Sequence, residues 1–174
     1  MSNAPVTARL AEFCRSIRYE QVPAETMEVA RQCLLDWLGV TIAGSSEPLA
    51  EMLRDEVLEE GGNAQATLIG SGHQVTAKQA ALVNGSASHA LDYDDVNLAM
   101  SGHPSVPIWP ALLALAEWRG GSGRDVLTAF VAGYEMECRV GMLVMPSHYS
   151  TGFHSTGTLG TFAAAAACAH LLRF

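Results

Sequence analysis

Three short stretches of this sequence combine ionisable side chains with glycine, proline or a helix end. They are His89–Asp95 with three aspartates, Ser101–Ser105 with one histidine, and Gly152–Thr158 with another. Loops held by rigid elements are where binding and catalytic side chains concentrate. These three stretches therefore hold the candidate functional residues.

Asp92, Asp94 and Asp95 place three carboxylates within four residues. Like charges this close disfavour full ionisation of the group unless a cation lies between them. A carboxyl of this kind, or a histidine paired with it, is suited to proton transfer near neutral pH. Two alternatives stay open. The aspartates are also compatible with ordinary loop solvation or capping, and Asp92 with Asp94 could begin a divalent-metal site, although no further acidic ligand follows at a suitable spacing.

His103 and His154 are the histidines of the second and third stretches. His154 precedes the last expected helix, with Ser155 or Thr156 as its candidate N-cap. The positive end of that helix favours an anionic ligand beside the imidazole, which can bind a carboxylate or move a proton. A single loop histidine is equally compatible with plain solvation. The other histidines are interpreted as structural or surface residues: His73, His89, His148 and His170.

Charge excludes some partners. The 174 residues carry 10 Lys and Arg against 18 Asp and Glu, a net charge of −8, with no basic stripe. Such a chain repels phosphate backbones, so we expect no nucleic-acid binding. No apolar run reaches the roughly 18 residues of a membrane span, and no signal peptide is visible at the N-terminus. We therefore expect a cytoplasmic protein that does not associate with membranes.

The sequence lacks the motifs of several common types of functional site. The sequence has no G-x-S-x-G elbow for a nucleophilic serine and no G-x-G-x-x-G for a dinucleotide. Its four cysteines are widely separated, so we predict buried free thiols and no metal or iron–sulfur centre.

Hydrophobic spacing is helical along nearly the whole chain, which predicts an all-α, multi-helix domain of about six to seven helices over residues 1–174. Residues 66–70 are the one extended piece and are judged too short to form a sheet, and residues 145–155 are expected to be a loop. The helices are expected at about residues 5–18, 23–43, 47–60, 76–91, 104–118, 125–144 and 158–172.

The last helix is apolar nearly all round and stops at Arg173-Phe174 without a glycine cap. A helix of this composition needs partner surface on most of its sides. We therefore expect a chain that is truncated at its C-terminus and, because its helices are apolar and alanine-rich, one that forms a homodimer.

Five stretches taken in order resemble the MmgE/PrpD family, which includes 2-methylcitrate dehydratase, cis-aconitate decarboxylase and iminodisuccinate epimerase. Together they cover nearly the whole chain. The matching text is CLLDWLGVTIAGSS at residues 33–46, NGSASHALDYDDVN at 84–97, SGHPSVPIWPALLALAE at 101–117, DVLTAFVAGYEMECRVG at 125–141 and GFHSTGTLGTFAAAAACAHLL at 152–172.

This resemblance implies the N-terminal helical domain of a lyase that works on a small polycarboxylate by acid–base chemistry without a cofactor. The family's site aspartate falls on Asp92, and its two site histidines fall on His103 and His154. We expect Asp92 and His103 to form the proton-transfer pair. His154 is expected to contact a substrate carboxylate, with Ser155 and Thr156 beside it as substrate-binding residues.

The chain also departs from the family pattern. A threonine of the decarboxylase branch would fall near Val96, which has no hydroxyl, and the loop before His103 is about one residue longer. Both departures argue against the decarboxylase branch. We expect an activity most like that of 2-methylcitrate dehydratase, with the decarboxylase and epimerase branches as alternatives. The later part of family members, with site lysines, a tyrosine and a smaller α+β lid domain, is absent here. We therefore expect this chain alone to be inactive, the alternative being a non-catalytic truncated helical module that only folds or dimerises.

Overall fold

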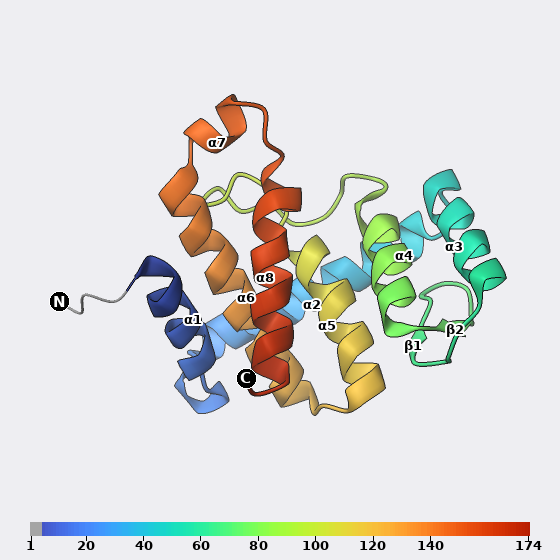
Figure 1. Ribbon diagram of the computed structural model, residues 1–174, viewed down its shortest axis with the longest axis horizontal. Helices are drawn as coiled ribbons and strands as arrows, with labels where there is room; N and C mark the ends of the chain where they lie inside the picture. The colour runs from blue at the N-terminus through green and yellow to red at the C-terminus, as the bar shows by residue number, and fades with distance from the viewer. Residues whose placement is uncertain (1–4) are drawn as a thin grey trace.

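The computed structural model describes residues 5–174, and these residues form a helical bundle with one short hairpin (Figure 1). The predicted all-α class is confirmed. Within the described residues the helices outnumber the prediction, because the expected loop at residues 145–155 contains a one-turn helix. The elements are α1 (Val6–Ser16), the 3-10 turn η1 (Tyr19–Gln21), α2 (Ala24–Gly44), α3 (Pro48–Glu60), α4 (Ala77–His89), α5 (Ser105–Arg119), α6 (Gly123–Val144), α7 (Ser147–Ser150) and α8 (Ser155–Leu171).

The extended piece does find a partner, contrary to expectation. Strand β1 (Ala66–Thr67) pairs antiparallel with β2 (Gln74–Val75), and Ala66 lies opposite Val75. Glu117 of α5 holds the hairpin in place, because its Oε2 accepts hydrogen bonds from the Thr67 backbone N at 2.9 Å and from the Thr67 hydroxyl at 2.7 Å. A two-residue strand is too short to leave a pattern in the sequence, and its pairing was missed for that reason.

Helix α5 lies at the centre of the bundle and contacts α2, α4, α6, α8 and β1. Its Trp109 is fully buried and stacks on Phe130 of α6, with ring centroids 4.1 Å apart. Aromatic pairs of this kind supply a large share of the apolar burial in a core. The principal core also includes Trp37, Ile108, Leu112, Ala129, Ala163 and Ala167.

Helix α8 packs so closely against α6 and α5 that only glycine fits at two positions, one at each contact. A Cβ on Gly133 would lie 2.8 Å from the backbone oxygen of Ala163. A Cβ on Gly160 would lie 2.5 Å from the side chain of Pro107. These glycines fix α8 against the bundle, and with it the position of the residue that precedes the helix, His154.

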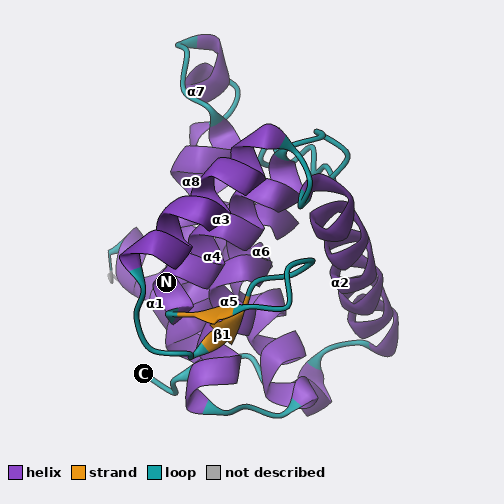
Figure 2. Ribbon diagram, turned by 90° about the vertical axis from the view of Figure 1, so that its right-hand side faces the viewer, coloured by secondary structure: helices purple, strands orange, loops and turns teal. Residues whose placement is uncertain are grey.

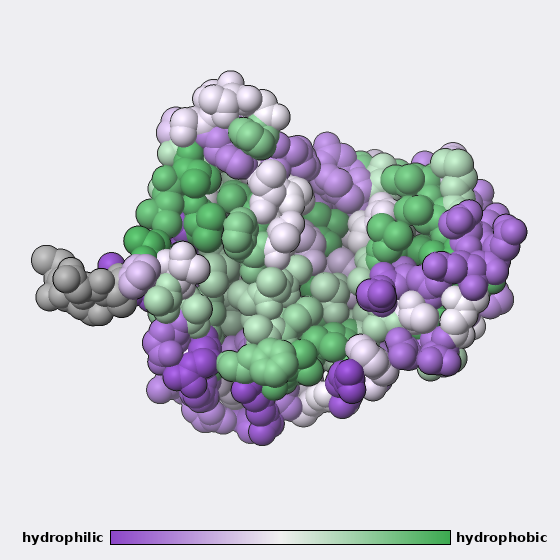
Figure 3. Space-filling view, viewed as in Figure 1, coloured by the Kyte–Doolittle hydropathy of each residue, from purple (hydrophilic) through white to green (hydrophobic). Residues whose placement is uncertain are grey.

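Helix α8 begins three residues earlier than expected, at Ser155, so its N-cap is His154 and neither Ser155 nor Thr156. The capping prediction was therefore wrong. The helix buries Leu159, Ala163 and Ala167, but it leaves Phe162 57% exposed. Its outer face is part of a pale apolar strip down the middle of the molecule (Figure 3).

The long loop between α4 and α5 crosses the same end of the bundle as the start of α8, and α7 projects beyond that end in both ribbon views (Figures 1 and 2). Two non-glycine residues of this loop adopt the left-handed conformation, Asp92 with φ 54° and Ser101 with φ 50°. A short bridge between Asn97 and Gly102 closes the loop on itself.

Two sequence expectations concern the chain as a whole. None of the described helices is long and apolar enough to cross a membrane.

The cysteines are free, as predicted, but only Cys14 and Cys33 are buried, whereas Cys138 and Cys168 are partly exposed.

Candidate functional site

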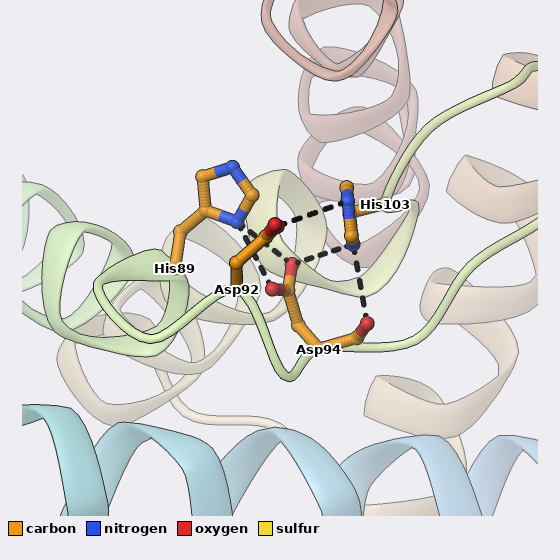
Figure 4. Close-up of side chains that lie close together, drawn as sticks. All are labelled: His89, Asp92, Asp94 and His103. Carbon is orange, nitrogen blue, oxygen red and sulfur yellow. Dashed lines mark hydrogen bonds and ion pairs between the residues drawn. The ribbon is translucent and has the colours of Figure 1, made fainter.

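The end of α4, the long loop and the start of α5 bring four ionisable side chains together (Figure 4). His89 is the last residue of α4, Asp92 and Asp94 lie in the loop, and His103 lies two residues before α5. The predicted pair Asp92 and His103 is therefore adjacent in space, and His89 and Asp94 join it.

The carboxylate of Asp94 lies between the two imidazoles, with His89 and His103 on either side (Figure 4). The His89 Nδ1 lies 3.0 Å and 3.1 Å from its two oxygens. The His103 Nδ1 lies 3.3 Å from the Asp94 Oδ2 and 3.1 Å from the Asp94 backbone oxygen. Because the Asp94 side chain is fully buried, these partners supply the contacts that a desolvated carboxylate requires.

The other nitrogen of His103 faces the second carboxylate, with Nε2 3.4 Å from the Asp92 Oδ1. The side chain of Asp92 is 78% exposed, while its backbone is held at a positive φ. A left-handed non-glycine residue costs on the order of 1 kcal/mol or more, and such residues are often found at functional sites.

His154 comes to this group from a different part of the chain. Its ring centroid lies 6.2 Å from that of His89, and the His89 and His103 centroids lie 5.0 Å apart. His154 is exposed and is the N-cap of the 17-residue helix α8. The positive end of the helix dipole therefore lies beside an imidazole that can reach a ligand. All three predicted site residues thus lie at one end of the molecule.

Ser155 and Thr156 are placed behind the histidines. Both are buried, and the Thr156 hydroxyl accepts a hydrogen bond of 3.0 Å from the His103 backbone N. The Ser155 hydroxyl faces the Met145 sulfur at 3.9 Å. In this arrangement Thr156 positions His103, and substrate binding by the two hydroxyl groups stays a prediction.

Asp95 shows that the capping alternative applies to one of the three aspartates. Its carboxylate accepts hydrogen bonds from the Ser105 backbone N at 3.1 Å and the Ser105 hydroxyl at 2.8 Å, at the first residue of α5. Burial raises the pKa of Asp95 above its usual value, and the hydrogen bonds from Ser105 oppose that shift. Asp95 therefore anchors the loop to α5, while Asp92 and Asp94 face the histidines.

Sequence reasoning missed the role of His89, which was interpreted as a structural or surface residue. One local signal was available, because a histidine at the end of a helix is favourably placed for a positive charge. The partner of His89 could not be found that way. Asp94 lies in the loop beyond the left-handed Asp92, where no helical spacing relates it to His89.

The donor atoms of His89, Asp92, Asp94 and His103 all lie within 4.8 Å of one another. The hydrogen bonds and ion pairs described above account for this spacing, and the expectation of no metal stays a prediction. A cavity of about 500 Å³ lies at the other end of α8 and does not include these residues. Two of the arginines that line it are near carboxylates, Arg124 with Glu20 and Arg173 with Asp125, both at 3.9 Å.

Comparison with known proteins agrees with the resemblance seen in the sequence. The model of the MmgE/PrpD N-terminal domain matches residues 8–174. A cis-aconitate decarboxylase-like protein of Aspergillus oryzae is 31% identical over 96% of this chain and 36% of its own length. The cis-aconitate decarboxylases of Aspergillus terreus and Homo sapiens are 24% and 27% identical over 96% of this chain. The chain spans about a third of the length of these curated relatives.

Proposed function

We propose that this chain, which belongs to the MmgE/PrpD family, carries the acid–base side of a lyase site for a small polycarboxylate. The observation that supports the proposal best is the hydrogen-bonded group at one end of the bundle. There the Asp92 carboxylate lies 3.4 Å from the His103 Nε2, and His154 lies at the start of a helix beside the same group.

The proposed reaction is the cofactor-independent elimination of water from a hydroxy-tricarboxylate. One group removes the proton next to a carboxylate, and another protonates the departing hydroxyl. Asp92 and His103 form the pair that moves a proton on one side of this reaction. His154 binds a substrate carboxylate, because its imidazole and the first turn of α8 both favour an anion.

Two substrates follow from separate observations. The absence of a hydroxyl at Val96 favours 2-methylcitrate, the substrate of the dehydratase branch that the sequence resembles. The names of the relatives favour cis-aconitate, because the decarboxylases of Aspergillus terreus and Homo sapiens are named for it. Both reactions need a proton-transfer group beside a carboxylate, and the first is our primary proposal.

The charge of the group suggests that other residues complete the site. Asp92 and Asp94 bring two carboxylates and His89 and His103 bring two imidazoles, so the cluster by itself offers little positive charge to a trianion. A substrate with three carboxylates needs cations to replace its hydration. We propose that those cations lie outside residues 1–174 and that this chain alone is inactive.

Association into a homodimer is part of the proposal. Met142 and Leu143 of α6 are 62% and 63% exposed, and Phe162 of α8 is 57% exposed. In the space-filling view, green covers much of α6, whereas α8 is nearly white in its upper part and pale green below (Figure 3). Contiguous exposed apolar surface favours association. We place the protein in the cytoplasm on the sequence features given above.

The test is an assay of the complete cellular protein that carries this chain. It is incubated separately with 2-methylcitrate and cis-aconitate, and the formation or rearrangement of the double bond is followed by proton NMR. Water loss from 2-methylcitrate is the expected result. Release of carbon dioxide from cis-aconitate would establish the second candidate instead. Turnover of neither would favour the non-catalytic module, whose remaining property, association, is measured by sedimentation.

A further inference from the structure

We propose that His89 is the base that accepts the substrate proton, working with His103 as the acid, and that the buried Asp94 carboxylate positions both. This inference rests on the proposed function, because it assigns the second proton-transfer group that dehydration requires. It starts from the hydrogen-bond partners of the four ring nitrogens.

The two imidazoles differ in what their Nε2 atoms face. Both Nδ1 atoms point at Asp94 oxygens, at 3.0 Å for His89 and 3.3 Å for His103. The Nε2 of His103 also faces a carboxylate, that of Asp92, at 3.4 Å. The His103 Nδ1 donates to the Asp94 backbone oxygen at 3.1 Å, and a lone pair on Nε2 would face the Asp92 carboxylate. The imidazolium form, with an N–H on both nitrogens, therefore suits this position, because neutral imidazole has only one N–H. His103 is thereby arranged as the proton donor.

His89 is arranged in the opposite way. Donation from its Nδ1 to Asp94 selects the neutral tautomer in which Nε2 keeps a free lone pair. The ring is one-third exposed and lies near both of the other site histidines, 5.0 Å from His103 and 6.2 Å from His154 between centroids. Among the described residues the His89 ring is hydrogen-bonded through its Nδ1 alone, so the lone pair on Nε2 is free to accept a proton from a bound substrate.

The net charge of Asp94 and its two imidazoles favours one extra proton on the pair of imidazoles. Asp94 is a single buried carboxylate that faces two imidazoles. One imidazolium and one neutral imidazole together with Asp94 form a unit of zero net charge, which is the least costly state for a buried group. The same state supplies one acid and one base side by side.

The proposed step balances. The Nε2 of His89 takes the proton from the carbon next to a carboxylate, the electron pair of that C–H bond forms the double bond, and the C–O bond to the hydroxyl breaks. His103 gives to that hydroxyl the Nε2 proton that it holds beside Asp92, and the hydroxyl leaves as water. His89 ends protonated and His103 neutral. The pair resets when His89 loses its proton to solvent and His103 regains one.

Asparagine and glutamine separate this role from a purely structural one. The side-chain amide of His89→Asn reproduces the Nδ1 donor to Asp94, whereas that of His89→Gln extends toward the Nε2 position, and neither can accept a proton at neutral pH. In the complete protein with 2-methylcitrate, we expect His89→Asn to lower kcat about a hundredfold with KM within about threefold. His73→Asn, in the exposed turn of the hairpin, is the matched control and should leave both constants unchanged.

A His89→Asn variant with at least a third of the wild-type kcat would overturn the proposal, because the hydrogen bond to Asp94 would then be sufficient. A second measurement does not depend on any activity. Nitrogen-15 NMR of the wild-type imidazoles should show His89 neutral and protonated at Nδ1, with His103 protonated at both nitrogens. A proton on the His89 Nε2 would overturn the assignment of the base, whereas an inactive wild type with the expected spectrum would count against the proposed function only.

Discussion

Two buried carboxyl groups, Asp94 in the loop and Glu137 inside α6, have the same exposure and opposite surroundings. Each has a fully buried side chain. Asp94 is in contact with two imidazole nitrogens, whereas both oxygens of Glu137 lack a hydrogen-bond partner among the described residues. Burial, and then the negative charge of Asp95, raise the pKa of Glu137 to about 9.

Asp94 is therefore arranged to act on other side chains, whereas Glu137 is only buried. A carboxylate with cationic partners can keep its charge in the interior, whereas a carboxyl without partners keeps its proton instead. A buried carboxylate acts on the side chains that contact it, as Asp94 contacts His89 and His103. The contrast therefore predicts that changes at Asp94 alter the reaction, and that changes at Glu137 alter stability and its dependence on pH.

The largest effect is expected for Asp94→Asn in the complete protein. The variant removes the charge that orients both histidines. Where a carboxylate orients a catalytic histidine, its loss lowers kcat roughly a thousandfold. Turnover of 2-methylcitrate is measured against Asp55→Asn, an exposed aspartate on α3, which should match the wild type. Full activity in Asp94→Asn would remove the contrast with Glu137.

Glu137→Gln should change stability with a defined sign. Glu137 has a pKa of about 9 in the folded protein, whereas the ordinary pKa of a glutamate, 4.5, applies when the chain is unfolded. The folded state therefore holds the extra proton in this window, and the free energy of unfolding falls as pH rises through it.

The glutamine variant lacks this titration. We expect it to unfold like the wild type at pH 5 and to be more stable at pH 8 by on the order of 3 kcal/mol. Urea unfolding at the two pH values is the measurement. Glu135→Gln, on the same helix but 43% exposed and paired with Arg139, is the control. An equal pH dependence in wild type and Glu137→Gln would mean that Glu137 is charged in the folded protein.

His103→Ala tests the group around Asp94 by removing one of its two imidazoles. Removing a proton-transfer group is expected to lower kcat about a hundredfold, or about 2.7 kcal/mol. Activity is measured with 2-methylcitrate, and sedimentation and circular dichroism check that the variant folds. Near wild-type turnover in a folded variant would exclude His103 from the mechanism.

The smallest effect is expected for Thr156→Val, which keeps the shape of the residue but removes the acceptor of the His103 backbone N–H. An unpaired buried donor costs about 1–2 kcal/mol. We expect a decrease of roughly 3 °C in the melting temperature and a fall in kcat of a few-fold, with KM little changed. Thr161→Val is the control, because its hydroxyl bonds only within α8 and is exposed. A rise in KM alone would favour the predicted contact of Thr156 with substrate.

Local patterns were enough for most of the fold. Apolar residues spaced three and four apart located the long helices, because a helix must bury one face and that requirement repeats every turn. The prediction failed where a local pattern is weak. The two-residue strands left no periodic signal, and the start of α8 at Ser155 depends on how the backbone leaves the loop after α7.

By itself the sequence determined the all-α class, the family, and three residues of the candidate site, Asp92, His103 and His154, because residue types at fixed spacings are local properties. Only the tertiary structure decided which groups these residues meet. The loop after α4 turns at the left-handed Asp92 and brings Asp94 between His89 and His103, while α8 brings Thr156 against the same loop. Hydrogen-bond partners depend on how loops close and helices pack. The spacing of residues along the chain does not determine which side chains come close in space.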